Sequence, residues 1–327
     1  MMFQSGYQRH VYSGFEPSQA FDVVYGGSFE HRLLSSIQST MEHRRLTLGD
    51  MRLETGRYNF PVIAQGDMPK KEICIGFMAD GWHLTKCNTM ALAKDEVQIY
   101  PAGVELLYHA SGASRWVILA LPEERLQAVA IARMGRELDL AKHAAYSLRL
   151  KAGGTNTLTS LTDDAFNLAH RLAPAGGVSP ELGIAVYDSL ASSYIDALFD
   201  AESLHPSEKS ATEIRHHRLI AACERLVLSG IESDIALTEI AQRSGYSLRA
   251  LELIFRRSVG MTPGRWFMTA RLNGALRDLL TGEDFATVSD VAMKWGFRHM
   301  SRFAQYYRKA FGESPSETLT RSRLRGI

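Results

Sequence analysis

Between residues 45 and 121, apolar and polar residues alternate over short stretches. In DMRLET, Met51 and Leu53 alternate with charged neighbours, which is the two-residue period of a half-buried strand. The stretches EICIGFM, NTMALA, DEVQIYP and RWVILAL are short apolar runs bounded by turn residues, as strands are. Several short strands at this spacing predict a sandwich or barrel. Pro122 then predicts the start of a helix.

The hydrophobic period becomes helical between residues 158 and 200. Apolar residues recur at every fourth position, at Leu182, Val186, Leu190 and Tyr194. This predicts a helical pair that packs on itself or on a second subunit. Residues 201–214 are polar, contain a proline and predict a linker. From residue 215 onward the pattern is helical.

The helical third contains a repeat. AQRSGYSLRALELIFRRSVGMTP, residues 241–263, resembles AMKWGFRHMSRFAQYYRKAFGESP, residues 292–315, with one extra residue in the second copy. The matching positions include Gly245 and Gly296, which supply the backbone freedom of a tight turn. Thr238 and Ser289 are expected to cap the preceding helices. Helix, glycine turn and helix together predict two helix-turn-helix motifs.

The second helix of each copy has an apolar and a polar face. Leu251 and Phe255 are predicted to face inward in the first copy, and Phe303 and Tyr307 in the second. The outward residues are of types that bind base edges in the major groove: Arg249, Glu252 and Arg256, then Arg302, Gln305 and Lys309. A merely solvated helix face explains one copy equally well, but two copies with matching turns favour DNA binding.

Charge separates the chain in the same way. Residues 215–327 contain 18 Lys and Arg against 11 Asp and Glu, whereas the other 214 residues contain 19 against 25. A basic third on an acidic body indicates a polyanionic partner for that third alone. Three scattered cysteines, no signal-peptide pattern and no membrane-length apolar run predict a cytoplasmic protein.

Residues 215–320 resemble the DNA-binding domain of the AraC/XylS family of transcriptional regulators. The resemblance rests on LTEIAQRSGYS, FRRSVGMTP, ARLNGALRDLL, VSDVAMKWGF and YRKAFGESPSE. Within the family, RLNGALRDLL and the second copy are most similar to regulators of ethanolamine-utilisation operons and related amine-responsive proteins. The resemblance implies an α+β protein with two main domains: a cupin-like β-barrel or sandwich with flanking helices, and an all-α domain with two helix-turn-helix motifs. The expected divisions are an effector domain 1–157, a helical pair 158–200 that is a candidate for dimerisation, a linker 201–214 and a DNA-binding domain 215–327.

The resemblance also implies base contacts from the start of each second helix. These positions are Arg249, Ala250, Glu252 and Leu253 in the first copy, and Ser301, Arg302 and Gln305 in the second. Leu253 departs from the polar residue often found there, which puts the first contact set in question. Arg298 and His299 replace small polar residues of the family and are expected to touch phosphate.

Candidate chemistry in the first half is weaker. Cys74, His83 and Cys87 lack the fourth ligand of a zinc site, so no metal or cofactor is expected. Aromatic and polar residues near predicted strands are candidates for an effector pocket or for ordinary core: Trp82, His83, Tyr100, Tyr108, His109 and Trp116.

The sequence therefore predicts a ligand-responsive transcriptional regulator, not an enzyme. We expect an activator of a catabolic operon that binds promoter DNA, works with RNA polymerase and senses a small molecule, an amine being one candidate. A homodimer is one of the assemblies that the helical pair allows, and the sequence does not decide the oligomeric state. The alternatives are a cupin-type metal enzyme, a DNA-repair protein with similar DNA-binding helices, and a nucleoid-type binder that takes no ligand.

Overall fold

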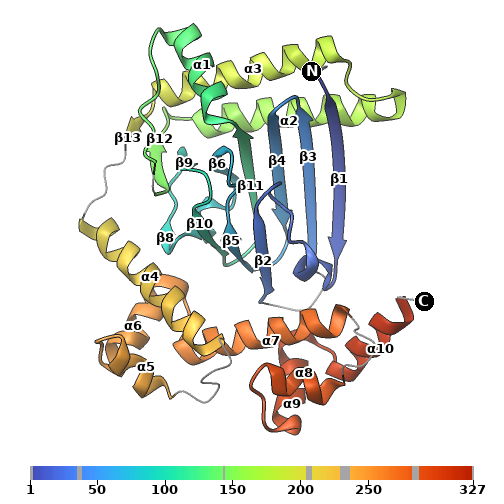
Figure 1. Ribbon diagram of the computed structural model, residues 1–327, viewed down its shortest axis with the longest axis vertical. Coiled ribbons are helices and arrows are strands. Elements are labelled where there is room, and N and C mark those ends of the chain that lie inside the picture. The colour runs from blue at the N-terminus through green and yellow to red at the C-terminus, as the bar shows by residue number, and fades with distance from the viewer. Residues whose placement is uncertain are drawn as a thin grey trace.

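The computed structural model describes residues 3–34, 39–142, 144–203, 208–228, 236–281 and 287–325. Figure 1 shows three layers: helices at the top, a pair of β-sheets in the middle and a helical part at the bottom. The described strands are β1 Ser5–Ser13, β2 Ser28–Leu33, β3 Thr40–Leu48, β4 Met51–Tyr58, β5 Val62–Asp67, β6 Ile73–Asp80, β7 Thr85–Cys87, β8 Met90–Ala91, β9 Glu96–Tyr100, β10 Glu105–Ala110, β11 Ser114–Leu121, β12 Tyr146–Arg149 and β13 Glu202–Ser203.

The strands form a β-sandwich, as the short alternating runs predict. The larger sheet has the order β1-β3-β4-β11-β6-β9-β12-β13 and the smaller one β2-β5-β10-β7-β8, with antiparallel pairing throughout. Strand β2 is an edge strand that pairs with β5 alone. One expected strand, NTMALA, shrinks to the two residues of β8, because Asn88 and Thr89 adopt positive φ angles of 49° and 68° and turn the chain.

Three helices cover the outer face of the larger sheet: α1 Glu123–Met134, α2 Gly154–Leu172 and α3 Pro180–Phe199. Pro122 is the N-cap of α1, one position before the first helical residue. Helices α2 and α3 form the expected helical pair. Leu190 and Tyr194 are buried in it, and together with Phe166 they join the core between the helices and the sheet.

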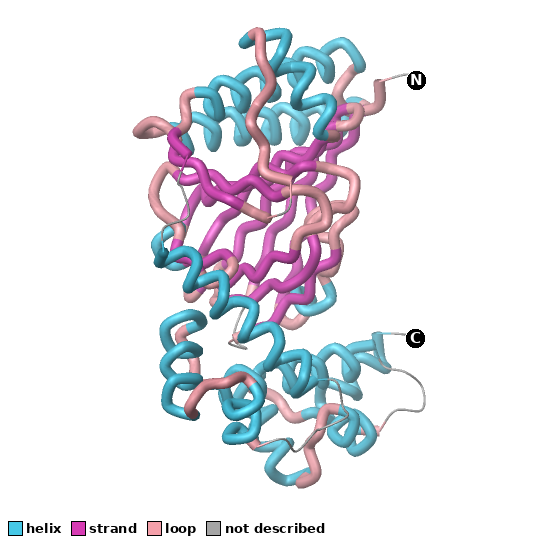
Figure 2. The backbone as a smooth tube through the Cα atoms, turned by 60° about the vertical axis from the view of Figure 1, so that its left-hand side comes forward, coloured by secondary structure: helices cyan, strands magenta, loops and turns pink. Residues whose placement is uncertain are grey.

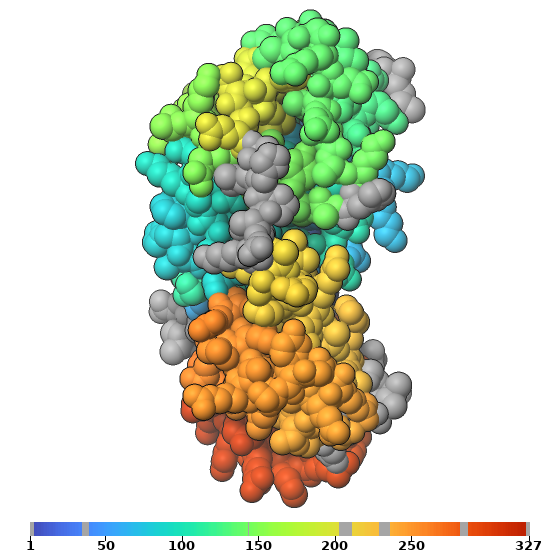
Figure 3. Space-filling view, turned by 90° about the vertical axis from the view of Figure 1, so that its left-hand side faces the viewer, coloured from blue at the N-terminus to red at the C-terminus, as the bar shows by residue number. Residues whose placement is uncertain are grey.

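The helical part consists of seven helices in the described residues: α4 Glu208–Leu228, α5 Leu237–Arg243, α6 Leu248–Val259, α7 Pro263–Thr281, α8 Val288–Lys294, α9 Met300–Phe311 and α10 Pro315–Arg325. Helix α4 begins inside the range expected to be a linker. Figures 2 and 3 show it at the junction of the sandwich and the helical part. Ile63 and Leu107 of the smaller sheet pack with residues of α4 and α6, so the two parts share a core.

None of the described helices is long and apolar enough to cross a membrane.

Candidate nucleic-acid interface

The first helix pair is α5 and α6. Gly245, with φ of +76°, makes the turn between them, a conformation that costs a residue with a side chain more than it costs glycine. Ser247 caps α6, because its side chain accepts a hydrogen bond from the Ala250 backbone amide at 3.2 Å. Gly260 ends the helix in the left-handed conformation.

The second pair, α8 and α9, has the same plan. Gly296, with φ of +78°, makes the turn, and Gly312 ends α9 in the left-handed conformation. Thr287 and Asp290 form a capping box at the start of α8, in which each side chain accepts from the other residue's backbone amide.

The expected caps Thr238 and Ser289 are wrong. Both lie at the second helical position, and the N-caps are Ala236 and Thr287. A cap is recognised by its non-helical backbone as much as by its hydroxyl, and both helices begin earlier than the hydroxyl pattern indicates. Consequently α5 has no side-chain cap, whereas α8 has two reciprocal ones.

The second helices bury and expose the residues that their pattern predicts. Leu251, Phe255, Phe303 and Tyr307 are fully buried. Ala250 and Glu252 are half-buried at the edge of the outer face of α6. The other candidate DNA contacts are exposed: Arg249, Leu253, Arg256, Arg298, His299, Ser301, Arg302, Gln305 and Lys309.

Helix α7 joins the two pairs and packs closely on the second. Gly274 lies so near the Trp295 ring that a Cβ atom at this position would come within 2.2 Å of ring carbons. The Trp295 indole also donates to the Asp278 carboxylate at 2.8 Å. This contact was not predicted from the sequence, although a glycine in the middle of a predicted helix is a signal of close approach.

Both second helices meet the sandwich by their last turns. Lys86 Nζ of β7 donates to the Arg257 and Ser258 carbonyl oxygens at the end of α6, at 2.7 and 3.1 Å. At the end of α9, the Phe311 ring stands edge-on to Phe15, with 5.8 Å between centroids. The first turns, where the candidate base contacts lie, are therefore left exposed.

A buried charged network joins β2 to α4 and α7. Arg32 donates to both Glu224 oxygens, at 2.8 and 2.6 Å, and to Glu30 at 2.9 Å, while Arg277 pairs with Glu30 at 3.1 Å. Burial lowers the pKa of Arg32, but the hydrogen bonds and charge of the two glutamates outweigh this effect and raise it above its usual value, so Arg32 is charged. Asn273 adds two hydrogen bonds to the Leu33 backbone.

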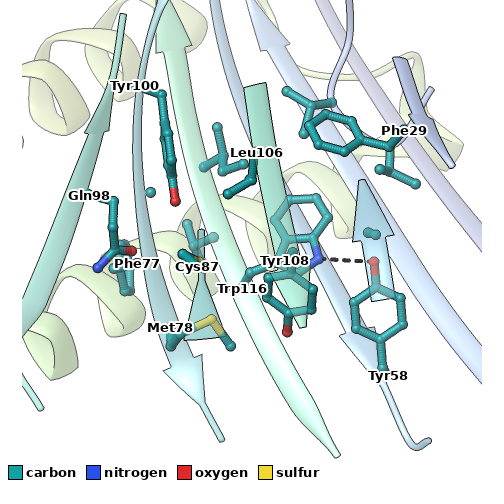
Figure 4. A pocket seen from close by; sticks show the side chains of 16 residues that line it. Phe29, Tyr58, Phe77, Met78, Cys87, Gln98, Tyr100, Leu106, Tyr108 and Trp116 are labelled. Carbon is teal, nitrogen blue, oxygen red and sulfur yellow. Dashed lines mark hydrogen bonds between the residues drawn. The ribbon is translucent and has the colours of Figure 1, made fainter. Parts of the chain in front are cut away.

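A separate cavity of about 40 Å³ lies inside the sandwich. Figure 4 shows its aromatic lining, with the Trp116 indole donating to the Tyr58 hydroxyl at 3.4 Å. Three of the six candidate effector residues line it: Tyr100, Tyr108 and Trp116. Further lining side chains come from both sheets and include Phe29, Tyr58, Ala64, Met78, Cys87, Gln98 and Leu106.

The titratable groups around this cavity are neutral at ordinary pH. Burial raises the pKa of the Cys87 thiol to about 12 and raises the pKa values of Tyr58 and Tyr108 above their usual range. His31, which hydrogen-bonds the Tyr58 hydroxyl at 2.9 Å, has its pKa lowered to about 4 by burial. No carboxylate is among the described lining residues.

The other three candidate effector residues do not line this cavity. His83 is exposed in the short 3-10 helix Trp82–Leu84, and Trp82 packs at the edge of the core. His109 follows Tyr108 on β10, so its side chain points to the opposite face of the sheet. The sequence pattern located the strands but not the face of each residue.

The three cysteines are free and buried. Among the described residues, no group of three or more His, Cys, Asp or Glu side chains is placed to hold a metal ion. Cys74, His83 and Cys87 are therefore not brought together as a metal site.

Comparison with known proteins links the helical part to DNA-binding regulators. Residues 240–321 match the family model described as a helix-turn-helix domain. The transcriptional activator NphR from Rhodococcus sp is 34% identical over 128 residues, which are 39% of this chain and 37% of that protein. The XylDLEGF operon transcriptional activator 2 from Pseudomonas putida is 30% identical over 105 residues, 32% of this chain and 66% of that protein.

One of the similar solved structures contains DNA. The DNA-binding domain of AdpA, described as a global transcriptional factor in complex with a target DNA, is 27% identical, covers 32% of this chain and 94% of its own, and gives a TM-score of 0.30. The matches to three of the curated regulators span between 21% and 37% of their lengths. Residues 240–321 thus match a helix-turn-helix domain, and both of the sequence relatives named above are transcriptional activators.

Proposed function

We propose that the chain is a sequence-specific DNA-binding transcriptional regulator with two helix-turn-helix motifs, α5–α6 and α8–α9. The observation that carries this proposal is the exposure of the first turns of α6 and α9 on one connected helical body. A second helix with a polar, exposed first turn is the element that enters the major groove in this motif.

The connecting helix has a suitable length for two adjacent grooves. Helix α7 has 19 residues, which corresponds to about 28 Å at the α-helical rise. Successive major grooves on one face of a duplex are about 34 Å apart. The length of α7 is close to this spacing, and the motifs at its two ends add to the span. We infer that a single chain contacts two half-sites one DNA turn apart.

The proposed contacts fall into two classes. Arg249 and Glu252 of α6, and Arg302 and Gln305 of α9, are assigned to base edges. Arg298, His299 and Lys309 are assigned to phosphates. The first class gives sequence preference, whereas the second gives affinity that falls with salt.

Selection of bound duplexes from a random pool tests the proposal. We expect enriched sequences with two conserved blocks whose centres are about 10 base pairs apart, one for each motif. A pool that stays random after several rounds, while the protein still binds DNA, would instead indicate a nucleoid-type binder.

We further propose that the cupin-like sandwich binds a small effector in the cavity around Tyr58, Tyr108 and Trp116, and that the protein activates a catabolic operon. The described lining residues are mostly apolar and aromatic, contain no charged side chain, and include tyrosines and the amide residue Gln98. Because a buried ammonium needs a charged or strongly hydrogen-bonding partner, this chemistry favours a neutral effector over the amine that the sequence resemblance suggests.

Three molecules of nearly the same shape separate these possibilities: benzyl alcohol, benzylamine and benzoate. We expect the neutral alcohol to raise the melting temperature of the full chain and the two ions to leave it unchanged. Stabilisation by benzylamine alone would restore the amine hypothesis. Contact with RNA polymerase and a homodimer through residues 158–200 stay predictions.

A further inference from the structure

We propose that strand β2 transmits occupancy of the sandwich cavity to the DNA-binding helices. This inference rests on the proposed function, because it describes how an effector would change DNA binding. It names one strand, with the outward-facing side chains of Glu30 and Arg32 and the backbone of Leu33, as the connection between the two sites.

The alternation of side chains along β2 puts the two sites on opposite faces of one strand. Phe29 points into the sandwich and lines the cavity, and His31 reaches the hydroxyl of Tyr58, another lining residue. Glu30 and Arg32 point outward to α7 and α4. Since successive side chains of a strand are fixed on alternate faces, a shift of Phe29 moves Glu30 and Arg32 with it.

The cavity is too small for an effector of several atoms unless a wall moves. Its volume is about 40 Å³, whereas an apolar cavity known to bind benzene has a volume of roughly 150 Å³. The larger sheet supplies stiff walls, because β4, β11 and β6 each pair with a strand on both sides. Strand β2 pairs on one side only and is therefore the wall that yields most easily.

The outward face of β2 is held by contacts that tolerate little displacement. The Arg32 side chain is 3% exposed and that of Glu224 is 6% exposed, and the Trp266 indole also donates to Glu224. A buried ion pair loses much of its stabilisation when its geometry is disturbed, because water cannot solvate either charge in its place. A small movement of β2 therefore favours separation of α4 and α7 from the sandwich.

The consequence reaches both DNA-binding motifs. Helix α4 packs against α6, and α7 runs from the first motif to the second. Glu224 lies on α4, while Asn273 and Arg277 lie on α7. Releasing these contacts frees the relative orientation of α6 and α9, which determines whether both helices fit one duplex.

Enlarging a lining side chain imitates the effector without requiring its identity. Ala64 lines the cavity from β5, directly opposite His31 of β2. In the full-length Ala64→Leu variant we expect hydrogen exchange in the Glu224 segment of α4 and the Arg277 segment of α7 to become about tenfold faster. We also expect the dissociation constant for selected DNA to change by about fivefold or more.

Two controls make this result specific. Arg133→Ala breaks an exposed ion pair with Asp196, between α1 and α3, and should leave exchange in α4 and α7 unchanged. If β2 acts through its ion pair, Glu224→Gln should mimic Ala64→Leu, and adding Ala64→Leu to it should produce little further change. Ala64→Val provides a smaller enlargement if leucine prevents folding.

The decisive comparison is between the sandwich and the helices. The role of β2 is overturned if hydrogen exchange in α4 and α7 of Ala64→Leu is unchanged while β6 and β11 of the same variant remain protected from exchange. Additive effects of Ala64→Leu and Glu224→Gln would overturn it too. Either result leaves the proposed function intact, because the proposed function is tested separately by the DNA sequences that the wild-type chain selects.

Discussion

The proposed first and second motifs, α5–α6 and α8–α9, share the same turn and the same helix end but differ in the residues that surround them. Both turn at a glycine with φ near +77° and both end at a left-handed glycine. Their surroundings differ, because Trp295 precedes the second turn and packs against Gly274, whereas Ser244 occupies the same place in the first. The shared turn and helix end give both helix pairs the same fold, whereas residues such as Trp295 determine which neighbouring helix each pair contacts.

Their attachment to the sandwich differs in the same way. The first motif is held near the buried pair of Arg32 and Glu224 and by Lys86. The second meets Phe15 through Phe311, and Arg321 of α10 stacks on the same ring at 5.3 Å. A polar network specifies one geometry, whereas an aromatic contact tolerates small sliding. We therefore expect the first motif to be fixed more precisely relative to the sandwich.

The largest expected effect comes from breaking the polar attachment. Glu224→Ala leaves Arg32 buried without its main partner, at a cost of about 3–5 kcal/mol in the free energy of unfolding. Urea denaturation measures this cost. The double variant Arg32→Met, Glu224→Leu should recover most of it, because it removes both charges. A loss below 1 kcal/mol in the single variant would mean that the pair does not hold the first motif.

The next effect concerns the outer faces. Arg302→Ala should relax base preference in one half-site and cost about 1–3 kcal/mol of DNA-binding free energy. Leu253→Ala, at an exposed apolar position of the first motif, should change base preference less. Selection from a random pool with each variant gives both profiles. Equal losses in the two half-sites would contradict the assignment of Arg302 to one of them.

Packing between α7 and the second motif can be tested by a substitution that adds one methyl group. Gly274→Ala forces the new Cβ against the Trp295 ring and should destabilise the helical part by about 1–3 kcal/mol. Gly264→Ala, also on α7, is the matched control, since its new Cβ would meet a methyl group of Leu237 on α5 at an ordinary contact distance of 3.7 Å. Thermal unfolding should show a loss for the first variant and no loss, or a gain, for the second.

The smallest effects are at the helix starts. Thr287→Ala removes the cap of α8 and should cost about 1 kcal/mol. Ala236→Thr, at the exposed N-cap of α5, should stabilise the first motif by a similar amount. Hydrogen exchange in the two short helices measures both changes. A stabilised α8 in Thr287→Ala would show that the capping box is not what begins this helix.

Local sequence signals located the motifs but not their contacts. Gly245, Gly296, Leu251 and Phe303 have the predicted roles, because turn geometry and helix periodicity involve residues close in the chain. The predicted N-caps, Thr238 and Ser289, lie two positions after the actual ones. A hydroxyl residue shortly before an apolar helical pattern is equally compatible with the N-cap and with an early position inside the helix.

Contacts between distant segments had no such signal. Arg32 and Glu224 are 192 residues apart, and neither charge stands out from its neighbours in the sequence. The cavity was predicted in part: Tyr100, Tyr108 and Trp116 line it, but His109 does not. A one-residue change of register reverses the face of a strand residue, and aromatic composition alone does not determine that register.

Attachment through the last turns of α6 and α9 has a kinetic consequence. The sandwich lies behind both helices, so a duplex can approach their first turns without waiting for the rest of the molecule to swing aside. Encounter would then be limited by diffusion and by the attraction of a basic surface for a polyanion. We expect the association rate constant to fall steeply as the ionic strength rises. We also expect it to be limited by diffusion and not by a slower conformational change of the protein.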